Sequence, residues 1–209
     1  IDAGQIGTPA VQRFRRLGAA PQAPWFFSER AGGGVIRDLM IHDIDQALWF
    51  AGPVDSVYAV QNPPTVDDRV PAPVTAHVVL THRNGVISHV HASWVQPGMP
   101  FRTSVEVAGS EGRLRYDSAE DHTLRTDAVL VEGATDYLPP MSPEESPYYA
   151  EIADFVSAIA EGREAAVTPE DGIQAVAVAE AAYASIASGA PVALPASSPA
   201  VALAEEATR

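Results

Sequence analysis

Cysteine and lysine are both absent from this sequence of 209 residues. The absence of cysteine excludes disulfide bonds, thiolate nucleophiles and cysteine-ligated metals. No apolar run approaches the ~18 residues of a membrane helix, and the 209 residues contain no basic-plus-apolar signal segment, so we expect no membrane partner. With 46% hydrophobic and 19% charged residues, the composition is that of a globular domain with a sizeable core. A chain without disulfide bonds suits a reducing compartment, and we expect a cytoplasmic protein.

Basic residues are few and unevenly distributed. The formal net charge is −14, from 13 basic residues (all arginine) and 27 acidic residues. Residues 1–116 carry ten arginines and ten acidic residues, whereas residues 117–209 carry three arginines and 17 acidic residues. Nucleic-acid phosphates are bound by clusters of basic side chains, and the acidic second half would repel them. The sequence therefore argues against a nucleic-acid partner.

Hydrophobic periodicity predicts one helix, a run of strands and two closing helices. The first helix covers residues 35–51, because its apolar residues gather on one side at 100° per residue, and Gly52-Pro53 ends it. Thr168 precedes a proline and two acidic residues, which is typical of a helix start, and that helix runs to about Ser188. The other closing helix is expected at 148–161, and strands at 10–17, 56–60, 74–81, 86–94, 102–108 and 113–116, with a weaker pair near 123–125 and 129–132.

Tight turns between these strands favour an antiparallel sheet. Asn84-Gly85 is a hairpin signal, since this pair tolerates the positive φ angles of a type I′ turn. Strands followed by segregated helices predict an α+β fold, with an open, largely antiparallel β-sheet and helices packed on one face. The strand at 74–81 is apolar on one side and mixed on the other. A half-apolar open face predicts a homo-oligomer that assembles through the sheet face.

The spacing Asp38-x-x-x-His42-x-x-Asp45 carries the strongest chemical signal. On an α-helix these three side chains fall within about 60° of one another and form an ionisable stripe. A carboxylate beside an imidazole raises its basicity and orients it, as general acid–base catalysis near neutral pH requires. The alternative is structural: Asp38 then stabilises the helix start, and His42 is an ordinary helix histidine.

Two further features have weaker chemical interpretations. His89-x-His91 places two imidazoles on one face of a strand, and with Asp38 and His42 they could form a two-histidine, one-carboxylate metal site. Solvated or interface histidines are the alternative, and this spacing identifies no metal ligand. The glycines at 32–34 precede a helix but lack the G-x-G-x-x-G spacing, so we interpret them as a tight loop.

Several stretches together resemble one protein family. They are Trp25 followed by AGGGVIRDLMIHDIDQALWFAGPVDSVYA, then VEVAGSEGRLRYD, and finally YYAEIADFVSAIAEG through TPEDGIQAVAVAEAAYASIASGAPVAL. They are similar to the C-terminal domain of the Gfo/Idh/MocA-type NAD(P)-dependent oxidoreductases. The similarity covers about residues 5–194, so we expect one domain at 1–194 and an Ala/Ser/Pro-rich tail at 195–209. Because the first residue is Ile1 rather than methionine, we expect a fragment or a processed product.

The resemblance implies a two-domain protein in which each domain has its own function. In the family, an N-terminal Rossmann domain holds NAD or NADP, and the C-terminal α+β domain forms the substrate site and usually the oligomer interface. This sequence resembles only the second domain: the nucleotide fingerprint and the family's Glu-Lys-Pro motif are missing, and a chain without lysine cannot supply the family's catalytic lysine. NAD or NADP is therefore expected in the full-length parent, and none is expected to bind this chain alone.

The resemblance also implies roles for individual residues. Asp38 and His42 match the family's aspartate–histidine pair, in which the histidine acts as acid and base on a substrate hydroxyl or carbonyl and the aspartate supports it. Asp45 matches the next acid and is expected to have a structural or supporting role. Arg16 and Trp25 are candidates for contact with the substrate.

Two functions follow from different interpretations of the resemblance. The first is the substrate-binding and oligomerisation domain of an oxidoreductase that transfers hydride to or from a sugar, cyclitol or similar hydroxy or keto compound, with the isolated chain inactive. The second is a stand-alone interaction or ligand-binding module that kept the fold without a redox domain. The metal-dependent enzyme described above is a third.

Overall fold

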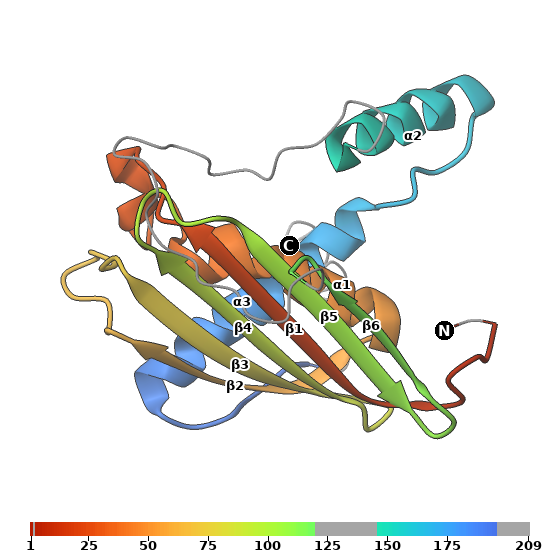
Figure 1. Ribbon diagram of the computed structural model, residues 1–209, viewed down its shortest axis with the longest axis horizontal. Helices are drawn as coiled ribbons and strands as arrows, with labels where there is room; N and C mark the ends of the chain where they lie inside the picture. The colour runs from red at the N-terminus through yellow and green to blue at the C-terminus, as the bar shows by residue number, and fades with distance from the viewer. Residues whose placement is uncertain (2, 120–145, 196–209) are drawn as a thin grey trace, which may run out of the picture.

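The computed structural model describes residues 1, 3–119 and 146–195, and these form one open sheet in the order β6-β5-β1-β4-β3-β2-β7 (Figure 1). The predicted α+β fold is confirmed, with every neighbouring pair of strands antiparallel except β1 and β4. The weak strands predicted near 123–125 and 129–132 lie outside the described residues. The strands are β1 (Pro9–Ala19), β2 (Val54–Asn62), β3 (Val74–His82), β4 (Ile87–Val95), β5 (Arg102–Gly109), β6 (Arg113–Asp117) and the short β7 (Val192–Ala193).

The helices lie on one side of this sheet or apart from it. α1 (Ile41–Ala51) and α3 (Pro169–Ser188) pack on the same face, whereas α2 (Pro147–Glu161) stands away from the sheet (Figure 1). The capping signal at the start of α3 is confirmed, since Thr168 and Asp171 form a reciprocal capping box. None of the described helices is long and apolar enough to cross a membrane.

The helix predicted at 35–51 consists of two parts. Val35–Met40 forms a π-helical turn, η2, and the α-helix begins only at Ile41. A π turn closes its hydrogen bonds between residues five apart rather than four. The assumed 100° per residue therefore does not hold before Ile41, so the residues before and after it do not form the single straight stripe that the sequence pattern predicted.

Alternation along β1 divides its side chains between two different environments. Phe14 is buried in the core beneath the helices, and Arg16 has the same parity and points to the same side. Arg13 and Arg15 have the opposite parity and are exposed. We call these the covered face and the open face of the sheet. Because β1 lies in the centre, between β4 and β5, each of its side chains has neighbours on both sides.

The β3–β4 hairpin turns where the sequence predicted, but with a different turn type. His82 O accepts a hydrogen bond from Gly85 N at 2.9 Å, and Gly85 has a φ of 87°. Asn84 has no positive φ, so the type I′ prediction is wrong. Four residues, 83–86, connect the two strands, and only Gly85 among them is in the left-handed region.

The core contains a buried polar bridge beside this hairpin. His82 is buried in β3, with Nδ1 2.7 Å from the Gly52 carbonyl oxygen and Nε2 2.8 Å from the Ser88 hydroxyl oxygen. The bridge joins the end of α1 to β3 and β4. Burial lowers the pKa of the His82 imidazole, and the hydrogen bond to Gly52 only partly offsets that effect.

Lowering the pH from 7 to 5 is expected to destabilise the fold in part through His82. The unfolded chain, with a histidine pKa of ~6.5, binds the proton more readily than the folded chain does, so this contribution is full above pH ~6.5 and declines below it. Urea unfolding at both pH values measures the effect. At pH 7 the free energy of unfolding of His82→Gln is expected to be about 1–3 kcal/mol below that of the wild type. Between pH 7 and 5 this variant is expected to lose less of its free energy of unfolding than the wild type does. The exposed His89→Gln should match the wild type in both respects. An unchanged pH dependence in His82→Gln would refute this link.

Candidate active site

The residues of the predicted ionisable stripe lie around the junction of η2 and α1. Asp38 belongs to the π turn, His42 to the first turn of α1 and Asp45 to the next. His42 is exposed, while Asp38 and Asp45 are half-buried. The charges of both carboxylates and of Asp43 favour a higher pKa for His42, although other influences outweigh them. The fold therefore brings the three predicted residues together and adds a fourth.

The net effect of the surroundings is to keep His42 neutral. Although the ring reaches solvent, neighbouring atoms partly desolvate it, and this desolvation lowers the pKa of His42 more than any other influence. The Arg16 guanidinium lowers this pKa further, and the nearby carboxylates only partly offset both effects. At neutral pH the imidazole is therefore predominantly in the form that accepts a proton.

A buried ion pair fixes this cluster to the sheet. Arg16 Nε lies 3.0 Å from Asp43 Oδ2, and Nη2 lies 2.7 Å from Oδ1. The Asp43 side chain is 0% exposed and that of Arg16 is 14% exposed. Burial raises the pKa of Asp43, and the hydrogen bonds from Arg16 oppose the rise. This two-pronged contact joins the central strand directly to the residue beside His42.

Asp43 is a functional residue that the sequence interpretation missed. A signal was present, because on an α-helix Asp43 shares a side with Met40 and Ala47, which are both fully buried. An acid on the apolar side of a helix needs a buried partner. That partner is Arg16, which the sequence predicted only as a candidate for substrate contact.

The guanidinium of Arg16 is only partly occupied by this pair. Nε and Nη2 bond Asp43, and the group lies 5.7 Å from the centre of the Phe101 ring. No hydrogen bond to a described residue uses Nη1. Arg16 therefore combines a fixed position with N–H groups that remain for another ligand.

The glycine loop before η2 is packed against the protein. A Cβ on Gly33 would lie 2.6 Å from Arg37 Cβ, and one on Gly34 would lie 2.8 Å from Tyr183 Oη. Tyr183, on α3, donates a hydrogen bond to the Gly33 carbonyl oxygen, and its ring faces the Arg37 guanidinium at 5.4 Å. The loop is tight, as predicted, because protein atoms fill the space that side chains at these glycines would need.

Trp25 lies in the same loop, in the short helix η1 (Pro24–Phe27). Its ring is exposed and stacks on Phe26 with the centroids 3.7 Å apart. Among the described residues no contact joins Trp25 to Asp38, His42 or Asp45. The exposed aromatic ring is available to a ligand, and contact with the substrate stays a prediction.

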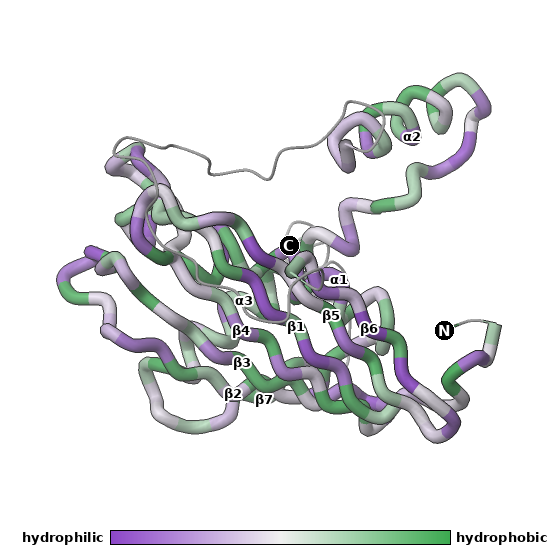
Figure 2. The backbone as a smooth tube through the Cα atoms, in the orientation of Figure 1, coloured by the Kyte–Doolittle hydropathy of each residue, from purple (hydrophilic) through white to green (hydrophobic). Residues whose placement is uncertain are grey.

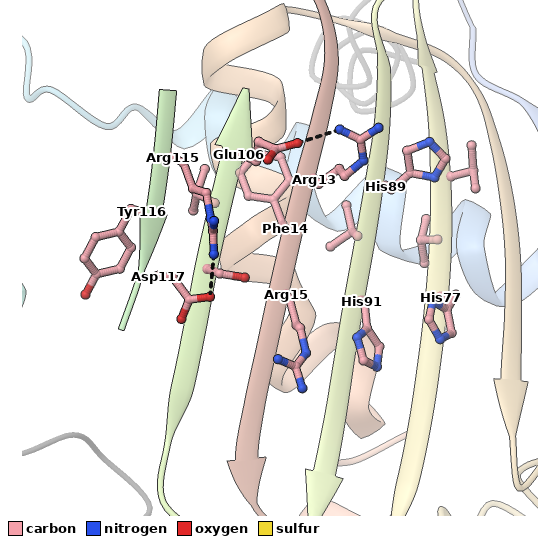
Figure 3. Close-up of a pocket in the computed structure, with 15 residues that line it drawn as sticks. Arg13, Phe14, Arg15, His77, His89, His91, Glu106, Arg115, Tyr116 and Asp117 are labelled. Atoms are coloured by element: carbon pink, nitrogen blue, oxygen red, sulfur yellow. Dashed lines mark hydrogen bonds and ion pairs between the residues drawn. The ribbon is translucent and has the colours of Figure 1, made fainter. Parts of the chain in front are cut away.

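A second candidate site occupies the open face. Residues of five adjacent strands, β6, β5, β1, β4 and β3, line a pocket of about 510 Å³ (Figure 3). The rings of His77 and His91 are stacked in parallel, with centroids 4.3 Å apart and an interplanar angle of 1°. Arg15 lies opposite His91 in the register and has no hydrogen bond or ion pair with another described residue, whereas Arg13 pairs with Glu106 at 2.7 Å. The pocket therefore presents one uncommitted cation beside two imidazoles.

The surroundings of His91 keep its imidazole neutral. His91 Nε2 lies 3.0 Å from Thr75 Oγ1 and 3.1 Å from Ser93 Oγ. Burial, with smaller contributions from His77 and Arg15, lowers the pKa of His91 to about 4. At neutral pH the His91 imidazole is therefore uncharged and lies beside the Arg15 cation.

The proposed metal arrangement is not formed. His89 and His91 lie on the open face, whereas α1, which carries His42, packs on the covered face. The sheet separates the two sets of ligands. No group of three or more metal-binding side chains exists among residues 1, 3–119 and 146–195.

Replacing Asp43 by alanine is expected to lower the free energy of unfolding by about 3–5 kcal/mol, because it leaves the Arg16 charge partly buried without its partner. Asp55→Ala is the matched control: this aspartate is exposed on β2, and its removal is expected to cost no more than about 0.5 kcal/mol. Denaturant unfolding of both variants measures the difference. Equal losses in the two variants would contradict the structural role assigned to the pair.

The sequence matches the GFO/IDH/MocA C-terminal domain over residues 1–115. An uncharacterized oxidoreductase of Bacillus subtilis, YrbE, is 30% identical over 202 residues, which are 93% of this chain and 57% of that protein. The myo-inositol 2-dehydrogenase of Thermotoga maritima is 29% identical over 191 residues, 89% of this chain and 56% of that protein.

The fold is similar to that of solved dehydrogenases. The crystal structure of GenD2 from gentamicin A biosynthesis, in complex with NAD, superposes on this fold with a TM-score of 0.75 at 26% sequence identity. The matched region includes 93% of this chain and 58% of the GenD2 chain. This chain thus spans little more than half the length of the proteins that it matches. Relatives with inositol and sugar substrates recur among these proteins. The match over more than half of the sequence shows that this chain belongs to the GFO/IDH/MocA C-terminal domain family.

Proposed function

We propose that residues 1–194 are the substrate-binding and oligomerisation domain of a longer NAD(P)-dependent oxidoreductase that acts on a sugar, cyclitol or similar hydroxy or keto compound. The observation that carries the proposal is the neutral His42 beside Asp38 at the start of α1, in a chain of this family. The relatives with inositol and sugar substrates support the substrate class. The chain's match to only part of each relative supports a longer parent.

In this proposal His42 exchanges a proton with the substrate. A hydroxyl that is to become a carbonyl must lose its proton to a base within hydrogen-bond reach, and in the reverse direction the carbonyl oxygen must gain one. The lowered pKa keeps the His42 ring ready to accept that proton, and the carboxylate of Asp38 stabilises the imidazolium that results. Asp45, half-buried one turn later, adds a smaller effect of the same sign.

Arg16 and Trp25 are proposed to position the substrate. The Asp43 carboxylate holds Arg16 beside His42, which leaves Nη1 to donate to a substrate oxygen. The exposed Trp25 ring offers an apolar surface of the kind that the C–H face of a sugar or cyclitol covers. NAD or NADP is proposed to bind elsewhere in the parent, since the glycine loop lacks the G-x-G-x-x-G spacing, and we expect the isolated chain to be inactive.

Replacing His42 by asparagine in the full-length parent is expected to lower kcat by about 10²–10⁴-fold with little change in KM, because proton transfer is lost and the polar volume is kept. Nicotinamide absorbance with myo-inositol as the first substrate gives the rate. His89→Asn, on the open face, is the matched control and should retain the wild-type kcat. In the wild type, kcat/KM is expected to fall on the acid side with a pKa below 6.5, following the lowered pKa of His42.

The same assay separates the proposal from its alternative. A stand-alone binding module would show no nicotinamide-dependent turnover in the protein as its gene encodes it, and His42→Asn would then change nothing. Turnover by the isolated 209-residue chain would contradict the expected need for a second domain. A His42→Asn parent with the wild-type kcat would remove the catalytic assignment.

We also propose that the open face is the surface through which copies of this chain assemble. Tyr58, Val60 and Ile87 are exposed on its strands, and the ladder of Thr75, Ser93 and His91 satisfies its own hydrogen bonds. The apolar side chains and the mutually hydrogen-bonded polar groups of this face cost little to desolvate. Self-association would also cover a sheet face that no described helix covers.

Introducing a charge on the open face is expected to weaken self-association. Val79 is half-buried there, opposite Tyr58 on β2 and His89 on β4. Val79→Arg is expected to raise the dissociation constant at least about tenfold, since a buried, unpaired charge costs more than 1.4 kcal/mol. Val176→Arg, on α3, is the matched control, and sedimentation velocity is the measurement. A wild type that stays monomeric at all concentrations, or association that Val79→Arg leaves intact, would contradict this part of the proposal.

A further inference from the structure

Helix α2 exposes a continuous apolar stripe. Six of its large apolar side chains are between 55% and 68% exposed: Tyr148, Tyr149, Ile152, Phe155, Val156 and Ile159. At 100° per residue all six fall on one side of the helix, so they form a single surface. In Figure 2 this helix carries green, hydrophobic stretches between purple ones, at a place where it stands apart from the sheet and from α3. An exposed apolar surface of this kind marks an interaction site.

The opposite side of α2 is held by its own C-terminal loop. The carboxylate of Asp154 accepts a hydrogen bond from Ala166 N at 2.7 Å and from Arg163 Nη2 at 2.8 Å. Ala158, on the same side of the helix, is buried. These contacts orient the helix so that its small and polar side faces the chain. The large apolar side therefore faces away, and α2 makes no substantial contact with another described helix or strand.

The composition of the stripe indicates the chemistry of its partner. The whole chain has a net charge of −14, yet the stripe contains no charged residue, and its two tyrosines lie at one end. A surface without charge in so acidic a chain favours an apolar partner that packs closely over a helix. The open face, by contrast, carries arginines, histidines and acids, so the two surfaces differ in the partner they fit.

We infer that the α2 stripe docks against the part of the parent protein that the relatives contain and this chain does not. This inference rests on the proposed function, because it requires a longer parent. The relatives match this chain over 56–58% of their own length, so more than two fifths of each relative has no counterpart in this chain. Proton transfer at His42 also requires that the two parts of the enzyme keep a fixed separation. A wide apolar helix face supplies such a rigid contact, whereas polar interdomain surfaces allow relative motion.

Hydrogen exchange tests the inference directly. In the full-length parent the amides of residues 148–159 are expected to exchange at least about 100-fold more slowly than in the 209-residue chain, because packing suppresses the local opening that exchange requires. The amides of α3, which already packs on the sheet, should change little and serve as the internal control. Equal exchange of α2 in both proteins would overturn the docking.

Substitution on the stripe provides a second measurement. Phe155→Ser in the parent is expected to abolish the protection of α2 and to split a single thermal transition into two, because the apolar contact between the two parts is lost. Phe155→Leu keeps the apolar contact and should restore both, which separates docking from helix formation. Val176→Ser, at an exposed position of α3, is the matched control and should leave both measurements unchanged. A Phe155→Ser parent that keeps its protection and its single transition would overturn the inference.

Two outcomes distinguish this inference from the proposal on which it rests. A parent no longer than this chain would overturn the proposed function and the docking together. A longer, active parent in which α2 exchanges freely would overturn the docking alone. Protection of α2 in the 209-residue chain that increases with concentration would show a second copy on the stripe and would also overturn the docking as stated.

Discussion

The two hydrogen bonds between Arg16 and Asp43 tie the central strand of the sheet to the helix that carries His42. A buried ion pair of this kind adds little net stability over a well-packed apolar pair, because desolvation offsets the attraction. Its effect here is geometric. It fixes the rotation of α1 over β1, it places a positive charge beside His42, and that charge helps to keep the imidazole neutral. This contact therefore helps to set both the position and the protonation state of the candidate base.

The start of this helix depends on a contact from the other end of the chain. Tyr183 on α3 donates to the Gly33 carbonyl oxygen, and Arg37 in the π turn pairs with Glu180 at 2.8 Å. The π turn that carries Asp38 is therefore held between the glycine loop and the last helix. π turns are uncommon and are frequent at functional sites. In this domain the turn brings Asp38 close enough to act on His42 without a straight α-helical stripe.

The surfaces of the domain differ in chemistry. The covered face is closed by α1 and α3, the open face carries a polar ladder with the stacked His77 and His91, and α2 presents an apolar stripe. Each surface suits a different neighbour because the desolvation cost of each is different. With three separate surfaces, the substrate, the second copy and the remainder of the parent that we propose as neighbours would not compete for one site.

The sequence by itself determined the elements of the fold and the location of the chemistry. Alternation and turn signals predicted the strands from β1 to β6, and the capping pattern at Thr168 predicted α3, because these signals act over a few residues. The spacing of Asp38 and His42 identified the candidate base for the same reason. Only the tertiary structure decided the rest. The parallel pairing of β1 with β4, the partner of Arg16, the π turn and the separation of His91 from His42 all depend on contacts between residues distant in the chain, and local periodicity contains no information about them.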